Sequence, residues 1–413
     1  MIKDILKKQL AIIKPDLSGI ESETKLIISC VEKEIRKQKQ KIRAFIGGSL
    51  AKKTLIKKEY YDVDIFLIFD KELENMSDTA EKILKKCFSI ERIHGSRDYF
   101  VLKSGKIYFE FIPILKIKNP RYAKNITDLS PSHVFYVTKK INKNPKIAEE
   151  IMLAKSFAHA CSTYGAESYI GGFSGYALEC LIIYYKSFLK FIKEVSKYKT
   201  RIILDPEKHY KNKGEILVNI NESKLASPII LVDPVFKERN VLASLNLETL
   251  ETFSRHCKKF LKNPSISMFT RQKVDLEKIK KQAKSKKAEL LIFQTKTKTL
   301  KYDVAGAKLK KFFNFLKFNI EKQFNLLESY FDFNEDKFSA RNIFVIRQKT
   351  KNIVKGPPEY KKENVKKFKK VHKNTFVKNS IVYAREKPIT LKDFLKESKD
   401  YNKKIAKDMG IIA

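Results

Sequence analysis

The run Tyr61-Asp62-Val63-Asp64-Ile65-Phe66-Leu67-Ile68-Phe69 sets two acids among bulky apolar residues. Side chains two apart in a strand point to the same face, so Asp62 and Asp64 share one face while Val63 and Ile65 pack on the other. Aligned carboxylates repel each other unless a cation lies between them, and a pair of divalent ions meets that requirement in many phosphoryl-transfer sites. Taken alone, a solvent-facing edge strand is the commoner explanation of such a pair.

A glycine turn stands upstream of these acids. Residues 42–46 form a short β-like segment that ends at Gly47-Gly48-Ser49, and Lys52-Lys53-Thr54 follows. Glycine lets a ligand approach the backbone closely, so Gly48 and Ser49 could present N–H groups and a hydroxyl to a triphosphate. Because such a turn has few structural reasons to precede two aligned acids, the combination predicts a nucleotide site.

Glu110 is the candidate for a third carboxylate. It lies in the strand-like segment Tyr108-Phe109-Glu110-Phe111-Ile112-Pro113, where an unpaired charge would be costly. A third acid would complete a metal cage and could orient or deprotonate an attacking hydroxyl. The alternative is an edge-strand glutamate paired with a lysine.

Hydrophobic periodicity predicts an α+β multidomain chain. Residues 1–140 form an α/β head with a small mixed sheet, residues 141–285 a mostly helical region, and residues 286–413 a basic C-terminal α+β domain. Within these domains we expect helices over residues 21–41, 78–89, 146–162, 174–195 and 246–261, a hairpin over 99–103 and 106–112, a polar irregular stretch over 197–226, a long amphipathic segment over 307–327, and a break at 356–358.

The composition favours a polyanionic partner. Lys and Arg number 86 against 47 Asp and Glu, which gives a formal charge of +39 that attracts nucleic acid, although a lysine-rich proteome would give the same excess. The 29 Phe, 18 Tyr and 43% hydrophobic residues argue for a folded chain. No apolar run of roughly 18 residues predicts a membrane span, and the first residues do not open a secretory signal, so we expect a cytoplasmic protein. The five separated cysteines predict reduced thiols without a zinc site or disulfides.

Together these residues resemble a known family. Gly48-Ser49 with Asp62-x-Asp64 and a later strand acid is similar to the DNA polymerase β nucleotidyltransferase superfamily. Three further segments are similar to the archaeal, class I CCA-adding enzymes: Tyr164-Gly165-Ala166-Glu167, Gly172-Phe173-Ser174-Gly175-Tyr176, and Val232-Asp233-Pro234-Val235 with Arg239-Asn240-Val241. Gly356-Pro357-Pro358 followed by a basic helix resembles the tail domain of that family.

The resemblance implies template-independent addition of C, C and A from CTP and ATP to the 3′ end of tRNA, with release of pyrophosphate. It implies that Asp62, Asp64 and Glu110 are catalytic and hold Mg²⁺ in a two-metal mechanism. It also implies that the nucleotide is bound by Gly48, Ser49, Lys52, His133, Lys155, Tyr164 and Arg239. The forked guanidinium of Arg239 suits reading of a base edge. The tRNA acceptor arm would contact the basic regions, with Lys308 and Lys311 as candidate contacts, and a homodimer is favoured.

Three departures from the family pattern affect the site. Glu110 replaces an aspartate, Lys52 stands where arginine is common, and Asp128-Leu129-Ser130-Pro131 lacks a cation that the family usually carries there.

Two rival functions stay open: an enzyme that adds a single nucleotide type, such as a poly(A) polymerase, and a catalytically dead RNA-binding homologue. Modification of small molecules fits poorly with a charge of +39.

Overall fold

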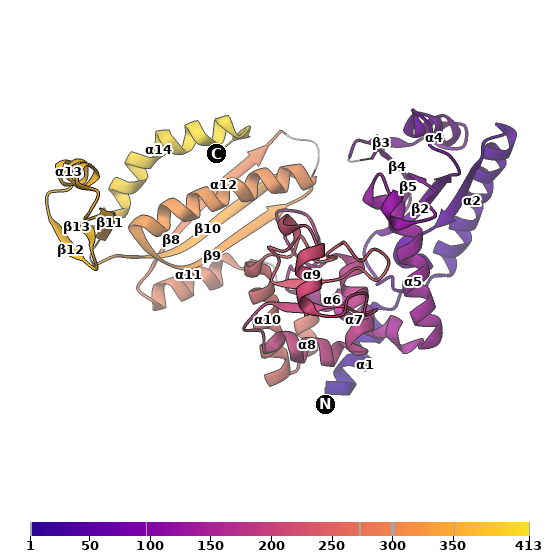
Figure 1. The fold of residues 1–413 in the computed structure, drawn as a ribbon, viewed down its shortest axis with the longest axis horizontal. Helices are drawn as coiled ribbons and strands as arrows, with labels where there is room; N and C mark the ends of the chain where they lie inside the picture. The colour runs from indigo at the N-terminus through magenta and orange to yellow at the C-terminus, as the bar shows by residue number, and fades with distance from the viewer. Residues whose placement is uncertain (1, 96, 272–273, 299–301, 351, 413) are drawn as a thin grey trace. The chain divides into compact units, whose positions relative to one another are not determined.

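The computed structural model describes residues 2–95, 97–271, 274–298, 302–350 and 352–412. The chain forms two compact units (Figure 1), one of Met1–Ala166 with Ile170–Gln272 and one of Glu167–Tyr169 with Lys273–Ala413. The architecture confirms the predicted α+β class: a head with a small mixed sheet, a helical region, and a C-terminal α+β part. The predicted boundaries at residues 140 and 285 remain predictions.

A five-stranded sheet forms the head, in the order β1-β2-β5-β4-β3. These strands are β1 Ile42–Ile46, β2 Tyr61–Phe69, β5 Ile107–Leu115, β4 Tyr99–Ser104 and β3 Glu91–Ile93. Strands β2 and β5 are parallel and the other pairs are antiparallel, so the sheet is mixed as predicted. The face that bears Val63, Ile65 and Leu67 packs against α2 (Ser18–Lys37) and α4 (Met76–Lys85), while Phe66 and Ile68 on the acidic face form a second apolar cluster with Val134.

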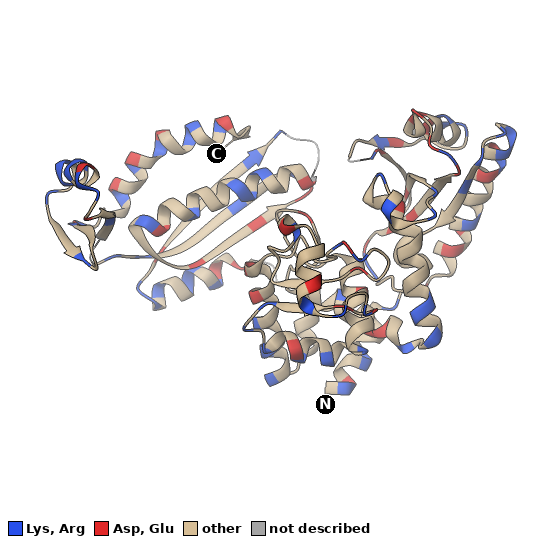
Figure 2. Ribbon diagram, in the orientation of Figure 1, with Lys and Arg blue, Asp and Glu red and all other residues tan. Residues whose placement is uncertain are grey.

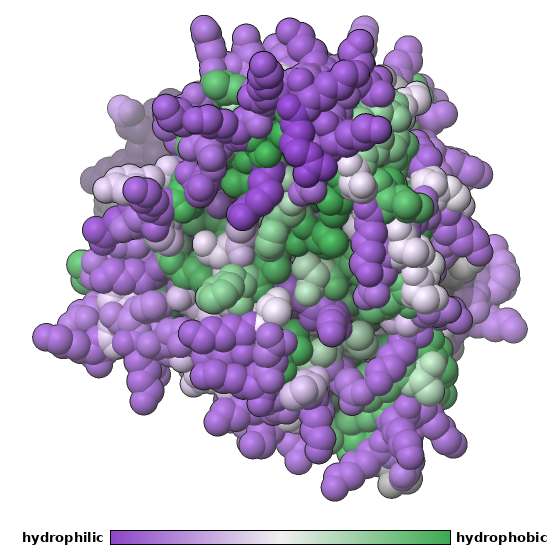
Figure 3. Space-filling model, turned by 90° about the vertical axis from the view of Figure 1, so that its right-hand side faces the viewer, coloured by the Kyte–Doolittle hydropathy of each residue, from purple (hydrophilic) through white to green (hydrophobic). Residues whose placement is uncertain are grey.

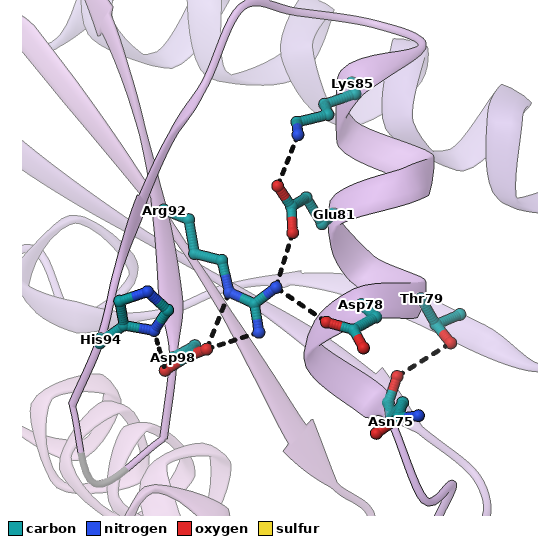
Figure 4. A network of polar contacts seen from close by, with 8 residues as sticks. All are labelled: Asn75, Asp78, Thr79, Glu81, Lys85, Arg92, His94 and Asp98. Carbon is teal, nitrogen blue, oxygen red and sulfur yellow. Dashed lines mark hydrogen bonds and ion pairs between the residues drawn. The ribbon is translucent and has the colours of Figure 1, made fainter.

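Charged contacts fix the outer strands of the head (Figure 4). The Arg92 guanidinium on β3 lies 2.7 Å from carboxylate oxygens of Asp78 and Glu81 on α4 and 2.6 Å from Asp98. Asp128, buried before α5 (Ser130–Lys143), is ion-paired with Arg97 and accepts a hydrogen bond from the Leu115 backbone at 2.9 Å. These contacts tie the start of α5 to the sheet.

Helices build the rest of the first unit around an aromatic core that includes Phe157, Phe188 and Phe253. They are α1 Ile2–Ile13, α6 Lys146–Ala160, α7 Gly175–Tyr185, α8 Phe188–Ser196 and α10 Leu247–Lys262. The single helix expected over 174–195 is wrong, because Lys186 adopts a left-handed φ of 61° and Ser187 caps α8. The stretch expected to be irregular holds α9 Lys213–Asn219 and β6 Ile202–Leu204, which pairs in parallel with β7 Ile229–Leu231.

The second unit contains two sheets, ordered β14-β8-β10-β9 and β11-β13-β12. Their strands are β8 Glu289–Thr297, β9 Phe324–Asn334, β10 Ser339–Gln348, β11 Asn352–Pro358, β12 Thr375–Lys378, β13 Ile381–Glu386 and β14 Ile411–Ile412, and the helices are α11 Leu276–Ser285, α12 Tyr302–Gln323, α13 Lys362–Val371 and α14 Leu391–Asp408. Phe312 and Leu316 of α12 pack on the larger sheet.

Two expectations for the second unit are wrong. The amphipathic segment expected to reach residue 327 ends as a helix at Gln323, because the apolar pattern continues directly into β9. The break expected at Gly356-Pro357-Pro358 lies inside β11, where proline is tolerated because the register with β13 shifts between Lys355 and Pro358.

The surface is strongly cationic. Lys and Arg occur on helices and strands of both units (Figure 2), and hydrophilic side chains ring a more apolar central area on the face drawn in Figure 3. Among the helices of the described residues, none has the length and apolar character that crossing a membrane requires. All five cysteines are free thiols, as predicted.

Candidate active site

The predicted glycine turn touches one of the predicted acids, Asp64. Gly48 begins the one-turn helix α3 (Gly48–Ala51) with φ +55°, and a Cβ atom built on it would lie 1.7 Å from Asp64 Oδ2. The Gly47 N–H also donates to the Asp64 carbonyl at 2.8 Å. Glycine is therefore required at position 48 by both the backbone conformation and the carboxylate that lies against it.

Three carboxylates share one face of the sheet. Asp64 and Glu110 are direct partners across β2 and β5, and Asp62 lies two residues earlier on the same face. Glu110 is on an interior strand and forms no ion pair within the described residues, which contradicts the alternative of an edge glutamate neutralised by lysine. Partial burial, together with the charges of Asp64 and Asp62, raises the pKa of Glu110 to about 7.

The three carboxylates line this face without converging on a single point. Asp62 is 55% exposed and lies 3.8 Å from Lys58, and no three acidic, His or Cys side chains of the described residues gather as closely as metal ligands do. Burial raises the pKa of Asp64 as well, and the charge of Asp62 adds to it. Asp64 and Glu110 lie opposite each other with Asp62 beside them, and neither forms an ion pair among the described residues, so the three carboxylates fit a site for divalent cations.

Lys52 and Lys155 meet at a fourth acid, the buried Glu179. Lys52 Nζ lies 2.7 Å from Glu179 Oε2 and Lys155 Nζ lies 2.8 Å from Glu179 Oε1, and the Glu179 side chain has no exposed surface. Burial alone raises the pKa of Glu179, but the charges of Lys155 and Lys52 outweigh it and lower that pKa to about 2. Sequence reasoning missed Glu179, although a lone acid in a helix as apolar as α7 signals a paired charge.

His133 and Arg239 meet at Asp233, which has no exposed side-chain surface. Asp233 Oδ2 accepts from Arg239 Nη1 at 2.7 Å and lies 3.2 Å from His133 Nε2, while Oδ1 accepts from Tyr176 Oη at 3.0 Å. The Tyr176 ring stacks on His133 with centroids 4.0 Å apart. Burial lowers the pKa of His133 against the opposing charge of Asp233. Asp233 and Tyr176 stand in segments that carried the resemblance, but sequence reasoning gave them no role.

Tyr164 lies beside the lysine cluster. Its ring stacks on His159 at 3.9 Å, and a Cβ atom built on Gly175 would lie 2.8 Å from Tyr164 Oη and 3.9 Å from Lys155 Cε. The charges of Lys52 and Lys155 oppose the rise in the pKa of Asp64 that burial causes, which places both cations within electrostatic reach of this acid. The first unit thus brings together all the predicted site residues except Lys308 and Lys311, which lie on α12 of the second unit.

Comparisons with known proteins identify relatives of this chain. Family models described as "Nucleotidyltransferase domain" and "tRNA nucleotidyltransferase, second domain" match residues 28–152 and 149–270. The CCA-adding enzyme of Nanoarchaeum equitans is 34% identical over 81% of this chain and 81% of its own length. That of Methanocaldococcus jannaschii is 28% identical over 93% of this chain and 87% of its length. The Cid1 poly(U) polymerase superposes with a TM-score of 0.53 at 12% identity, over 65% of this chain and 98% of that one, which shows a shared fold.

Proposed function

This chain belongs to the family of CCA-adding enzymes, and on that premise we propose that it adds C, C and A to the 3′ end of tRNA. CTP and ATP are the substrates, pyrophosphate leaves, and no nucleic-acid template is used. The observation that carries the proposal is the pairing of Asp64 with Glu110 on the strands beside the Gly48 turn. An acidic face and a turn that can receive phosphate are what nucleotidyl transfer requires.

The acidic face accounts for metal binding. Asp62, Asp64 and Glu110 would hold the divalent ions, and we propose Mg²⁺ because oxygen ligands suit it and it accompanies triphosphates. When bound, the ions supply Lewis acidity that activates the 3′-hydroxyl and neutralises the triphosphate. The side chain of Glu110 is longer than that of an aspartate, so its carboxylate can reach further from β5 toward the proposed divalent ions.

The remaining residues orient the nucleotide. Gly48 and Ser49 present backbone N–H groups to the phosphates, and Lys52 adds a positive charge next to that turn. Arg239, 27% exposed and held by Asp233, can offer the rest of its guanidinium fork to a base edge. Tyr164 and His133 flank the bound nucleotide. Catalysis then rests on positioning and electrostatics, because the reaction needs no covalent nucleophile from the chain.

The cationic surface accounts for the RNA partner. A formal charge of +39 favours a polyanion, and A-form RNA is bound mainly through its shape and phosphates. Lys308 and Lys311 of α12 are proposed contacts for the acceptor arm. A cytoplasmic location and a homodimer remain parts of the proposal.

The test uses tRNA transcripts that lack CCA, lack only the final A, or are complete. Purified protein and Mg²⁺ receive CTP and ATP separately and together, and the products are sized. We expect three nucleotides to be added to the transcript that lacks CCA, one to the transcript that lacks only the final A, and none to the complete transcript. Asp62→Ala and Asp64→Ala should be inactive. Asp70→Ala should be active, because Asp70 follows the same strand but pairs with Lys116 at 2.9 Å. Long tails of one nucleotide would show that the protein is a single-nucleotide tailing enzyme instead. Binding of tRNA without addition would show that it is an inactive homologue.

A further inference from the structure

Glu179 lies at the centre of a buried charge cluster that joins three separate parts of the first unit. Lys52 and Thr54 come from the segment that follows α3, Lys155 from α6, and Glu179 from α7. Lys52 is 127 residues from Glu179 in the sequence, and their charged atoms lie 2.7 Å apart. The cluster therefore links the turn that carries Ser49 to the helices behind it.

The hydrogen bonds of the two lysines are unequal. Lys155 Nζ donates to Glu179 Oε1 at 2.8 Å, to Thr54 Oγ1 at 2.9 Å and to the Thr54 carbonyl at 3.4 Å. These contacts use all three donors of its ammonium group. Lys52 donates to Glu179 within the described residues, and two of its donors have no protein acceptor there. Lys52 therefore has donors available for a ligand, whereas Lys155 must release Thr54 to gain one.

The carboxylate of Glu179 holds two like charges together. Lys52 is 9% and Lys155 5% exposed, and ammonium groups so deeply buried repel each other and favour the neutral form without a counter-charge. Thr54 completes the arrangement, since its hydroxyl donates to Glu179 Oε1 at 3.1 Å. Removing the carboxylate would leave both ammonium groups without their shared anion and Lys52 without the acceptor that fixes its direction.

We propose that Glu179 is a positioning residue for the incoming triphosphate, acting through Lys52, whose ammonium group it holds in place by the 2.7 Å ion pair. Lys155 completes the ion pair from behind and keeps Glu179 in place. The inference rests on the proposed function, because the ligand is taken to be CTP or ATP. It assigns to the apolar helix α7 a part in substrate binding without direct contact.

The test measures CTP binding by titration calorimetry in the absence of tRNA, and the Michaelis constant for CTP during addition. Wild type, Glu179→Gln, Lys52→Ala and the double variant are compared. Loss of a charged hydrogen bond predicts CTP affinity weaker by about tenfold to a hundredfold in Glu179→Gln. Because Glu179 acts through Lys52, the double variant should bind no more weakly than Lys52→Ala alone. The rate at saturating CTP should fall much less than the affinity.

Glu207→Gln is the matched control, since it removes an ion pair of the same kind, with Lys140 at 2.6 Å, in the same unit. This substitution should leave CTP affinity unchanged. Circular dichroism establishes that each variant is folded. If Glu179→Gln does not fold, Glu179→Asp decides, because its shortened carboxylate should still weaken CTP binding. Wild-type affinity in the folded variant, or losses that multiply in the double variant, would overturn the inference. A wild-type protein that neither binds CTP nor extends tRNA would instead refute the proposed function.

Discussion

Replacing Gly48 by alanine is expected to abolish nucleotide addition while the fold persists. The new Cβ atom would lie 1.7 Å from Asp64 Oδ2 and 2.6 Å from Asp64 Cγ. Non-bonded heavy atoms pack at roughly 3.5 Å, so the Asp64 carboxylate must retreat by about 2 Å. Misplacement of a catalytic group by about 1 Å can cost about a hundredfold in rate, and we expect at least that loss in kcat.

Gly105→Ala is the control that separates the steric contact with Asp64 from the effect of alanine on the backbone. Gly48 and Gly105 both have φ +55°, but a Cβ atom on Gly105 meets nothing within 4 Å. An alanine in this conformation costs roughly 1–2 kcal/mol of folding free energy, so Gly105→Ala should lose about that amount and Gly48→Ala somewhat more, because it also displaces Asp64. Only Gly48→Ala should lose activity.

The assay measures kcat for CMP addition to tRNA lacking CCA, together with the free energy of unfolding by urea titration. The reasoning is refuted if Gly48→Ala adds nucleotides at a rate near that of wild type. It is equally refuted if Gly105→Ala loses as much activity as Gly48→Ala, because the effect would then come from the backbone and not from Asp64.

Three further predictions follow from the same contacts. Asp233→Asn removes the charge that holds Arg239 and His133, so discrimination between CTP and UTP in single-addition assays should fall by about tenfold, with a smaller effect on kcat. Because the pKa of Glu179 is lowered to about 2 in the folded state, its stabilising contribution is present above about pH 4.5 and is lost as the pH falls. The difference in Tm between wild type and Glu179→Gln should therefore narrow between about pH 6 and about pH 3. Lys308→Ala combined with Lys311→Ala should weaken tRNA binding and reduce its salt dependence by about two counter-ions, while CTP affinity measured without tRNA stays unchanged.

Local patterns in the sequence sufficed for the catalytic strand. The alternation in residues 61–69 fixes both the strand and the face of its acids, and β2 has these same bounds. Gly48 lies against Asp64 in the structure, and its role in binding a nucleotide with those acids stays a prediction. Such features depend on residues close in the chain, where the period of a strand determines what shares a face.

Long-range partners could not be predicted in this way. Glu179 is an acid in an apolar helix, which signals that it needs a counter-charge, but nothing in the pattern says that Lys52 supplies it from 127 residues away. The break between α7 and α8 was missed because Lys186 takes a left-handed φ of 61° that a lysine rarely adopts. The end of α12 was missed because the helix and β9 present a continuous apolar pattern.

The buried acids of the first unit are of two kinds: acids that are paired with cations and orient them, and acids without an ion-pair partner that can bind metal. Glu179 holds two lysines and Asp233 holds Arg239, His133 and Tyr176; both acids have no exposed side-chain surface and a lowered pKa. Asp64 and Glu110 have no ion-pair partner within the described residues and have a raised pKa, because burial and the charges of neighbouring acids outweigh the opposing charges of Lys52 and Lys155 at Asp64. An acid that is already neutralised can only orient its cations, whereas uncompensated acids on one sheet face gain most from a divalent ion. Removal of metal by a chelator should therefore abolish nucleotide addition at Asp64 and Glu110 and leave the cation clusters at Glu179 and Asp233 in place.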